Sequence, residues 1–147
     1  MSSKTTEARA LMLAMPGSLP LARALAASCA GDSAEVTRHQ FPDGESLVRV
    51  DAPVQGRRVV LVAHLHEPDA KLLPLLFAAD TARELGATSV ELVTPYLPYM
   101  RQDMRFRPGE AITSHTFAAV LSAHFDALVT VDPHLHRIAR LEDVYTL

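Results

Sequence analysis

The sequence predicts an α/β domain built on a mostly parallel sheet with helices on both faces. Short apolar runs typical of buried strands alternate along the chain with longer segments typical of helices. Gly and Pro residues separate most of these segments, as expected for turns. The 147 residues suit one compact domain, and 48% of them are hydrophobic, which is enough to form a buried core.

Six short apolar segments are expected to be strands: residues 10–15, 34–39, 46–50, 58–65, 89–94 and 127–131. The third of them alternates in polarity, as an antiparallel or edge strand would. Helices are expected at residues 19–30, 68–85 and 113–124, with Ser18 and Thr113 as N-caps of the first and third. Pro74 lies inside the second helix and predicts a kink or a later start. Residues 137–147 begin another segment that does not resemble a complete helix.

The composition argues against several classes of partner. A net charge of −3 gives no general attraction to nucleic acids or anionic membranes. No stretch is apolar enough to cross a bilayer, and the polar residues 1–9 do not resemble a signal peptide. Cys29 is the single cysteine, which excludes an intrachain disulfide and agrees with the cytoplasmic location that we expect.

The segment at residues 95–110 is rich in groups that can bind anions. It follows a predicted strand and includes Arg101, Gln102, Asp103, Arg105 and Arg107. Ligands of parallel sheets bind beyond the carboxyl ends of the strands, and arginine matches phosphate oxygens with a planar fork of donors. A solvated charged loop is the alternative interpretation of this composition.

A second cluster, with Asp132, His134 and His136, follows the last predicted strand. In an extended chain such alternate residues point to the same side, so these could converge on one ion or phosphate. Mg²⁺ prefers oxygen ligands, whereas transition metals would take the histidines more readily. A turn with exposed histidines is the alternative.

The third cluster is a turn at residues 41–45. Phe41 could stack on a base, while Asp43 and Glu45 could accept hydrogen bonds from an amino group. A simple turn explains the same residues. His64 and His66 also follow a predicted strand, and their participation, like that of His136, stays open. Walker, Rossmann and Gly-x-Ser-x-Gly signatures are absent from the sequence.

Taken in order, the three clusters resemble the amino-terminal half of the ribose-phosphate diphosphokinase (phosphoribosyl-diphosphate synthetase) family. The resemblance covers the chain from about residue 10 to its end. The matched residues are Phe41, Asp43, Gly44 and Glu45 in a Phe-x-Asp-Gly-Glu turn; Pro95, Tyr96, Tyr99, Arg101, Gln102 and Asp103 in a Pro-Tyr-x-x-Tyr-x-Arg-Gln-Asp segment; and Val131, Asp132 and His134 in a Val-Asp-x-His strand end.

The resemblance implies a fold and a set of roles. Members have two domains, each similar to a type I phosphoribosyltransferase, with ATP between them. Arg101 and Gln102 then resemble the ATP-binding pair with Asp103 beside them, and Arg101 and His134 resemble catalytic residues. Asp132 and His134 resemble the metal site, which would take Mg²⁺. The turn with Phe41, Asp43 and Glu45 resembles the one that reaches the adenine of a neighbouring subunit, which implies a homo-oligomer.

The implied reaction transfers a diphosphoryl group from ATP to ribose 5-phosphate, giving 5-phosphoribosyl 1-diphosphate and AMP. Members bind ribose 5-phosphate in a second domain, whose acidic loop rich in Thr and Gly does not occur in these 147 residues. We therefore expect this chain to be the ATP-side half and to be inactive alone. The alternative is a non-catalytic synthetase-associated regulatory or binding module of the same fold. A phosphoribosyltransferase proper is a weaker alternative, because it needs the same missing loop.

Overall fold

The computed structural model describes residues 8–147, so most of the polar segment at residues 1–9 lies outside the described residues. Its strands are β1 (Leu11–Ala14), β2 (Asp32–Glu35), β3 (Thr37–Gln40), β4 (Ser46–Arg49), β5 (Arg58–Val62), β6 (Ser89–Val93) and β7 (Leu128–Val129). Its helices are α1 (Leu19–Ser28), α2 (Asp69–Glu84), α3 (Thr113–His124) and the short 3-10 helix η1 (Leu141–Asp143). Among residues 8–147, no helix combines the length and apolar character needed to cross a membrane.

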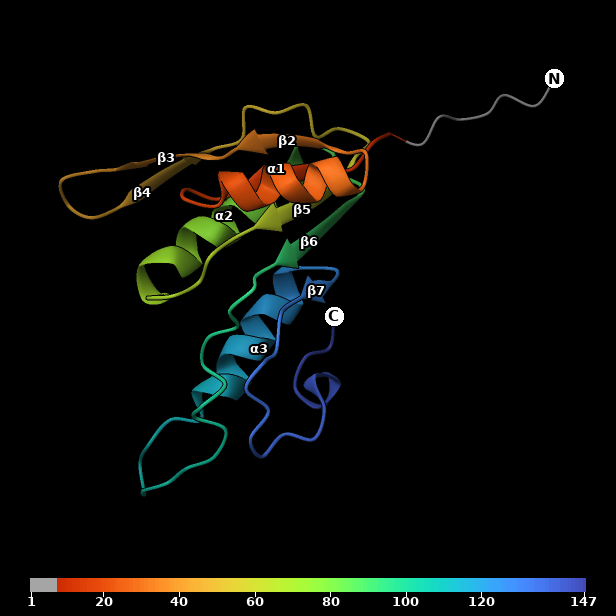
Figure 1. Cartoon of the computed structure of the whole chain (residues 1–147). Coiled ribbons are helices and arrows are strands. Elements are labelled where there is room, and N and C mark those ends of the chain that lie inside the picture. Colours follow the sequence, from red (N-terminus) through yellow and green to blue (C-terminus); the bar gives the residue numbers. More distant parts are fainter. Residues whose placement is uncertain (1–7) are drawn as a thin grey trace.

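The main sheet is parallel throughout and has the strand order β2-β1-β5-β6-β7 (Figure 1). Its central strands are buried on both faces, which explains their nearly continuous apolar sequence. Alternate residues point to opposite faces: Leu13 and Leu61 belong to one core cluster, whereas Met12 and Val60 belong to the other. The predicted mostly parallel α/β fold is therefore confirmed.

Helices cover both faces of this sheet. On one face, Ala22 and Ala26 of α1 pack on β1 and β5 within the smaller core cluster. On the other face, α2 and α3 bury apolar side chains such as Leu75 and Leu121 in the larger cluster. Because all sheet strands run the same way, the loops after β5, β6 and β7 meet at one edge of the sheet.

A two-stranded antiparallel hairpin, β3–β4, extends away from the body of the domain (Figure 1). The turn at its tip is closed by hydrogen bonds from the Phe41 N–H to the Glu45 carbonyl and from the Glu45 N–H to Asp43 Oδ1. Gly44 has a φ of +93°, a left-handed conformation that glycine adopts without strain. The antiparallel strand predicted at residues 46–50 is confirmed as β4.

Several predicted boundaries were wrong. The strand predicted at residues 34–39 is two strands, because the chain leaves the main sheet at the buried Val36 to pair with β4. The strand predicted at residues 127–131 pairs only over two residues. Beyond these residues, the Thr94 N–H donates to the Val129 carbonyl at 3.0 Å and the Pro95 carbonyl accepts the Val131 N–H at 3.1 Å, so the two segments stay joined past β6.

The helix ends also differ from the prediction. Ile112, not Thr113, occupies the N-cap of α3. Ser18 is the N-cap of α1, but its hydroxyl accepts the His64 N–H at 3.2 Å instead of capping its own helix. The second helix begins at Asp69 and runs through Pro74, which is buried against the core, so the predicted later start does not occur.

Candidate functional site

The loops that follow β5, β6 and β7 lie at the carboxyl edge of the sheet and share a backbone feature. Each contains one non-glycine residue with positive φ: Glu67 at 50°, Tyr99 at 60° and Asp132 at 47°. Such conformations are costly for residues other than glycine and are concentrated at functional sites. The carboxyl edge of the sheet is therefore the candidate location of a binding site.

The loop after β6 is anchored from inside. Leu97 and Met100 are buried in the larger core cluster, and the Thr94 hydroxyl donates to the Tyr96 carbonyl at 2.8 Å. These contacts hold the backbone while Tyr96 and Arg101 stay exposed. Apolar residues thus fix the loop, while Tyr96 and Arg101 on either side of them face solvent.

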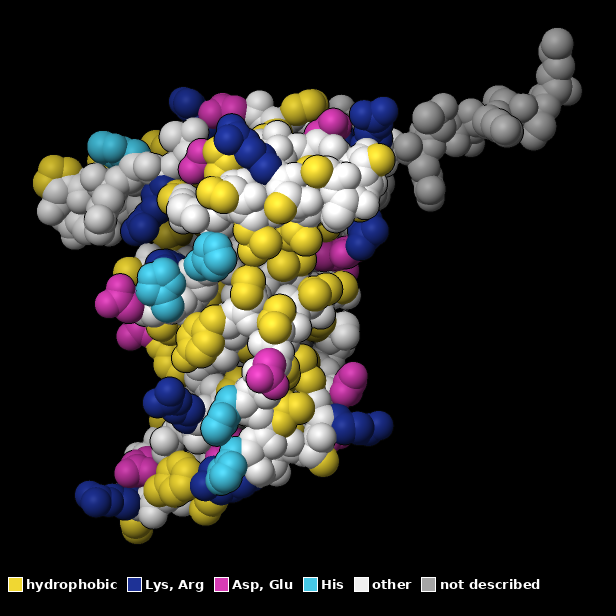
Figure 2. All heavy atoms as spheres, viewed as in Figure 1, with side chains coloured by type: hydrophobic (Ala, Val, Ile, Leu, Met, Phe, Trp, Pro, Cys, Tyr) yellow, Lys and Arg dark blue, Asp and Glu magenta, His cyan; other side chains and the backbone are white. Residues whose placement is uncertain are grey.

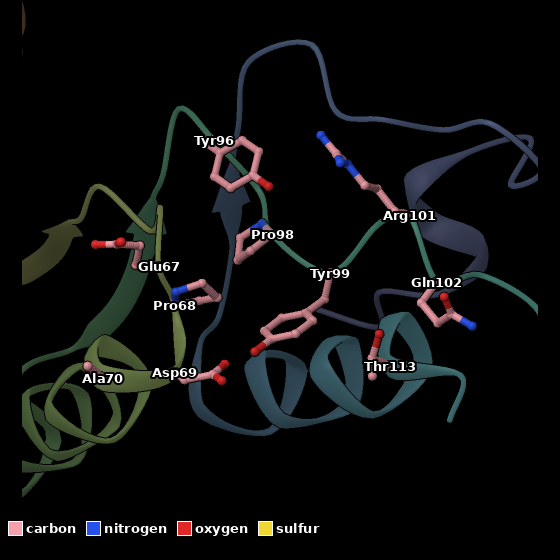
Figure 3. A pocket seen from close by; sticks show the side chains of 10 residues that line it. All are labelled: Glu67, Pro68, Asp69, Ala70, Tyr96, Pro98, Tyr99, Arg101, Gln102 and Thr113. Atoms are coloured by element: carbon pink, nitrogen blue, oxygen red, sulfur yellow. The ribbon is translucent and has the colours of Figure 1, made fainter. Parts of the chain in front are cut away.

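A cleft of about 690 Å³ opens beside this loop, a volume within the range of small-molecule sites (Figure 3). Arg101 and Gln102 lie on one side of it, Glu67 and Asp69 lie on the other, and Tyr96, Pro98 and Tyr99 lie between them. The residues that line it are Glu67, Pro68, Asp69, Ala70, Tyr96, Pro98, Tyr99, Arg101, Gln102 and Thr113. The cleft thus combines a cation, carboxylates and aromatic surface.

Arg101 and Gln102 differ in how the protein holds them. Within residues 8–147, the Arg101 guanidinium makes no hydrogen bond or ion pair, so its donors are free for a ligand. The Gln102 amide nitrogen donates to the Met104 carbonyl and to Glu110 Oε2, both at 3.2 Å. Glu110 also accepts the Arg107 N–H at 3.1 Å, so it closes the charged segment into a compact loop.

Asp103 does not line the cleft. Its side chain is fully buried and bonded to Arg137, with Arg137 Nη1 at 2.7 Å and the Arg137 backbone nitrogen at 3.2 Å. Burial opposes the charged carboxylate, but the hydrogen bonds and charge of Arg137 hold the pKa of Asp103 below its ordinary value. Asp103 therefore joins the loop after β6 to the segment after β7.

Asp132 and His134 lie in the segment that follows β7, next to the loop after β6. The two segments are joined by the bond between Val131 and Pro95 and by the bonds between Arg137 and Asp103. Asp132 and His134 are exposed and are not among the residues that line the cleft. The His134 ring stacks on that of His136, with centroids 5.6 Å apart. On the face seen in Figure 2, histidine and arginine side chains gather over these two segments.

The side chains available as metal ligands can be compared with the expected Mg²⁺ site. No group of three or more His, Cys, Asp or Glu side chains within residues 8–147 is arranged to hold a metal ion. The carboxylate of Asp132 is a ligand of the kind that Mg²⁺ takes together with phosphate oxygens and water. Asp132 and His134 are the residues that would contribute.

The turn with Phe41, Asp43 and Glu45 lies at the tip of the hairpin, far from the loop after β6 (Figure 1). The Phe41 ring is 40% exposed and contacts only the edge of His39 among the aromatic groups described, at 5.0 Å between centroids. Asp43 and Glu45 line a second hollow of about 580 Å³ between the hairpin and α2. Within one chain, the turn and Arg101 therefore do not share a cavity.

His64 and His66 are exposed after β5, beside Lys71. Lys71 Nζ donates to the His64 carbonyl at 2.9 Å and lies 3.3 Å from His66 Nδ1. They do not line the cleft beside Arg101. Histidines that follow a strand therefore do not by themselves identify the residues of the cleft.

Comparison with known proteins identifies the family. Residues 10–124 match the family described as the N-terminal domain of ribose phosphate pyrophosphokinase. The chain belongs to the ribose-phosphate pyrophosphokinase family. One relative, the ribose-phosphate pyrophosphokinase of Methanopyrus kandleri, is 40% identical over 124 residues, which make up 84% of this chain and 43% of that protein. The predicted family, whose other name is ribose-phosphate diphosphokinase, is thereby confirmed.

Solved structures agree with this assignment. The phosphoribosylpyrophosphate synthetase of Mycobacterium smegmatis matches with a TM-score of 0.72 at 28% identity, over 84% of this chain and 43% of that one. A hypoxanthine-guanine phosphoribosyl transferase of L. donovani matches with a TM-score of 0.50 at 12% identity, over 88% of this chain and 67% of that one. The second likeness concerns the fold alone and confirms the phosphoribosyltransferase-like architecture. The chain spans less than half the length of the pyrophosphokinases it matches.

Proposed function

We propose that this chain is the ATP-side half of a ribose-phosphate diphosphokinase. The observation that carries the proposal is Arg101, whose guanidinium has no partner among the described residues and borders a cleft with aromatic surface. An unpaired arginine suits phosphate oxygens, and Tyr96 and Tyr99 offer surface on which other parts of a nucleotide can pack. Family membership makes ATP the nucleotide we infer.

In the proposed reaction, the 1-hydroxyl oxygen of ribose 5-phosphate attacks the β-phosphorus of ATP. A new P–O bond forms, the bond between the β-phosphorus and the oxygen bridging to the α-phosphate breaks, AMP leaves with that oxygen, and the hydroxyl proton is released to water. Such transfers depend on positioning and neutralisation of charge. Arg101 supplies fixed positive charge, and Gln102, oriented by Glu110, supplies a neutral polar contact.

Mg²⁺ supplies neutralisation of phosphate charge when bound. We propose that Asp132 and His134 hold it together with phosphate oxygens, and that His134 also contacts the phosphates. Their support is position: both lie on the loop joined to that of Arg101. They also match the Val-Asp-x-His strand end of the family.

We propose that ribose 5-phosphate binds in a second domain, because the acidic loop rich in Thr and Gly that binds it in the family does not occur in these 147 residues. We therefore propose that the chain alone binds ATP without catalysing transfer and that the complete enzyme works in the cytoplasm in nucleotide biosynthesis. Nucleic acids and membranes are not proposed partners, because the net charge is −3.

We also propose a homo-oligomer in which the turn with Phe41, Asp43 and Glu45 reaches the adenine in a neighbouring copy. The support is that this turn lies at the exposed tip of the hairpin (Figure 1) and that none of its residues lines the cleft of its own chain. Mixing chains carrying Arg101→Ala with chains carrying Asp43→Ala should restore part of the ATP binding that each lacks alone. If mixing restores nothing, each site is made within one chain.

Calorimetric titration tests the proposed function. ATP with Mg²⁺ should bind to the chain, ribose 5-phosphate should not, and the chain should release no AMP when both are present. Binding of ribose 5-phosphate, or robust turnover by this chain alone, would refute the half-site assignment. A regulatory module would instead bind no ATP and change the activity of a complete relative when added to it.

A further inference from the structure

The contact between Asp103 and Arg137 joins segments that follow two different strands. Asp103 lies in the loop after β6, and Arg137 lies 34 residues later, in the segment after β7. The carboxylate accepts two hydrogen bonds, from Arg137 Nη1 at 2.7 Å and from the Arg137 backbone nitrogen at 3.2 Å. One bond comes from the side chain and one from the main chain, so the contact fixes the path of the backbone as well as the guanidinium.

A third contact strengthens this link. The guanidinium carbon of Arg137 lies 4.7 Å from the centroid of the Phe106 ring, which belongs to the same loop as Asp103. Arginine favours such stacking, because its planar cation is attracted to the face of an aromatic ring. Arg137 is thus held by the loop after β6 at two points.

The ends of this link lie next to the residues proposed to bind phosphate. Asp103 follows Arg101 and Gln102 directly, and Arg137 comes three positions after His134. The Asp103 side chain is fully buried, whereas that of Arg137 is 39% exposed, so the carboxylate depends on Arg137 for its charge partner. Neither loop can shift alone without breaking the contact.

An ion pair in which one partner is buried, as Asp103 is here, contributes little to stability by itself. Removing two charges from water costs about as much as their attraction returns, and apolar residues of similar size often stabilise a protein at least as well. Such pairs are better explained where a defined arrangement is needed. Here the arrangement is between the loop of Arg101 and the segment of His134.

We propose that Arg137 is a positioning residue that sets the place of the Asp132–His134 segment relative to Arg101. The proposal rests on the function proposed above. Arg137 acts through Asp103 and Phe106 and is not itself assigned a contact with ATP. In that place, Asp132 and His134 would hold Mg²⁺ while Arg101 would neutralise phosphate charge, so the loss of Arg137 should affect the binding of MgATP more than that of metal-free ATP.

The test compares ATP binding with and without Mg²⁺ in the wild-type chain, Arg137→Ala and Arg137→Lys. Mutation of residues that orient metal ligands commonly changes metal affinity by about 10- to 100-fold. We expect Arg137→Ala to weaken MgATP binding by about tenfold and to reduce the gain in affinity that Mg²⁺ brings, with a smaller loss in metal-free ATP binding. Arg137→Lys should recover part of the gain, since it keeps the charge but loses the planar fork.

Arg140→Ala is the matched control. Arg140 lies three residues further along, is 75% exposed and, within residues 8–147, forms its one ion pair with Asp143, at 3.5 Å. Its loss should leave both affinities unchanged. Hydrogen exchange of the free protein gives a second measurement: in Arg137→Ala, the amides of residues 99–103 and 131–136 should exchange faster together.

The outcomes separate the two proposals. If wild-type chain binds no ATP, the proposed function and this inference both fail. If wild type binds MgATP but Arg137→Ala lowers only the melting temperature, with the Mg²⁺ gain intact, Arg137 is structural and the inference alone is wrong. Should Arg137→Ala fail to fold, Arg137→Lys decides: a Mg²⁺ gain equal to that of the wild type contradicts the inference, and a reduced gain supports it.

Discussion

The interior of the sheet and the loops at its carboxyl edge are organised by different forces. In the interior, apolar side chains of β1, β5 and β6 pack in two layers, and residues such as Leu61 are fully buried. At the edge, the contacts are specific bonds between distant segments, such as Arg137 to Asp103 and Val131 to Pro95. Substitutions in the interior should therefore change stability, whereas substitutions at the carboxyl edge should change ligand binding.

The largest expected effect is in the interior. Leu61→Ala should lower the free energy of unfolding by about 2–5 kcal/mol, because it leaves a cavity where a fully buried side chain packed. Urea denaturation measures this change. Leu73→Ala, at a position on α2 that is 58% exposed, should change stability by no more than about 0.5 kcal/mol. Equal losses in the two variants would show that Leu61 does not pack in the core.

The next prediction concerns ATP affinity and compares arginines at the two ends of the strands. Arg101→Ala should weaken ATP binding by about 10- to 100-fold, as expected for lost hydrogen bonds to a charged group, with little change in melting temperature. Arg58 lies at the opposite end of the strands and pairs with Glu91 at 2.7 Å. Arg58→Ala should do the reverse: slightly lower stability with ATP affinity unchanged. Titration and thermal melting of both variants measure this contrast, and a large melting loss in Arg101→Ala with intact binding would make Arg101 structural.

The smallest effect concerns Asp126, which precedes β7. Burial raises its pKa, but the Val90 N–H at 2.8 Å and Arg83 at 3.1 Å together hold the pKa of this carboxyl below its ordinary value of 3.8. The charged form is therefore favoured by folding, so its contribution is fully present above that value and is lost as pH falls through the lowered pKa. Because the side chain is 46% exposed, Asp126→Asn should cost only about 0.5–1 kcal/mol at neutral pH.

Unfolding measured across the acid range checks the sign of this effect. The difference in stability between wild type and Asp126→Asn should shrink as the pH drops below 3.8. A difference that grows toward low pH would mean that the charged carboxylate is not stabilised in the folded state.

The sequence was sufficient for the sheet and for the family. Uninterrupted apolar runs such as residues 58–62 predict buried parallel strands, because their side chains must be covered on both faces. The Arg-Gln-Asp segment predicted a ligand-binding loop, and the structure places Arg101 and Gln102 at a cleft. The antiparallel strand at residues 46–50 was also evident from its alternating pattern.

The rest depended on contacts that no local pattern encodes. Nothing near Asp103 indicates that Arg137 buries it, since the two are 34 residues apart. Glu110 was likewise missed, because its role requires the loop to close on Gln102. Residues 34–39 were predicted as one strand. In the structure, β2 pairs with β1 and β3 pairs with β4, and the local sequence does not indicate that the pairing partner changes between them.

We propose that nucleotide binds at the carboxyl edge of the sheet, which can be measured by amide chemical shifts on addition of ATP with Mg²⁺. Shifts should change at residues 96–102 and 131–137, while those of α1 and the opposite ends of the strands should stay the same. Arg101→Ala should abolish these changes at the same ATP concentration. Shifts confined to α1 or to the ends of the strands near Arg58, with residues 96–102 unchanged, would contradict the claim.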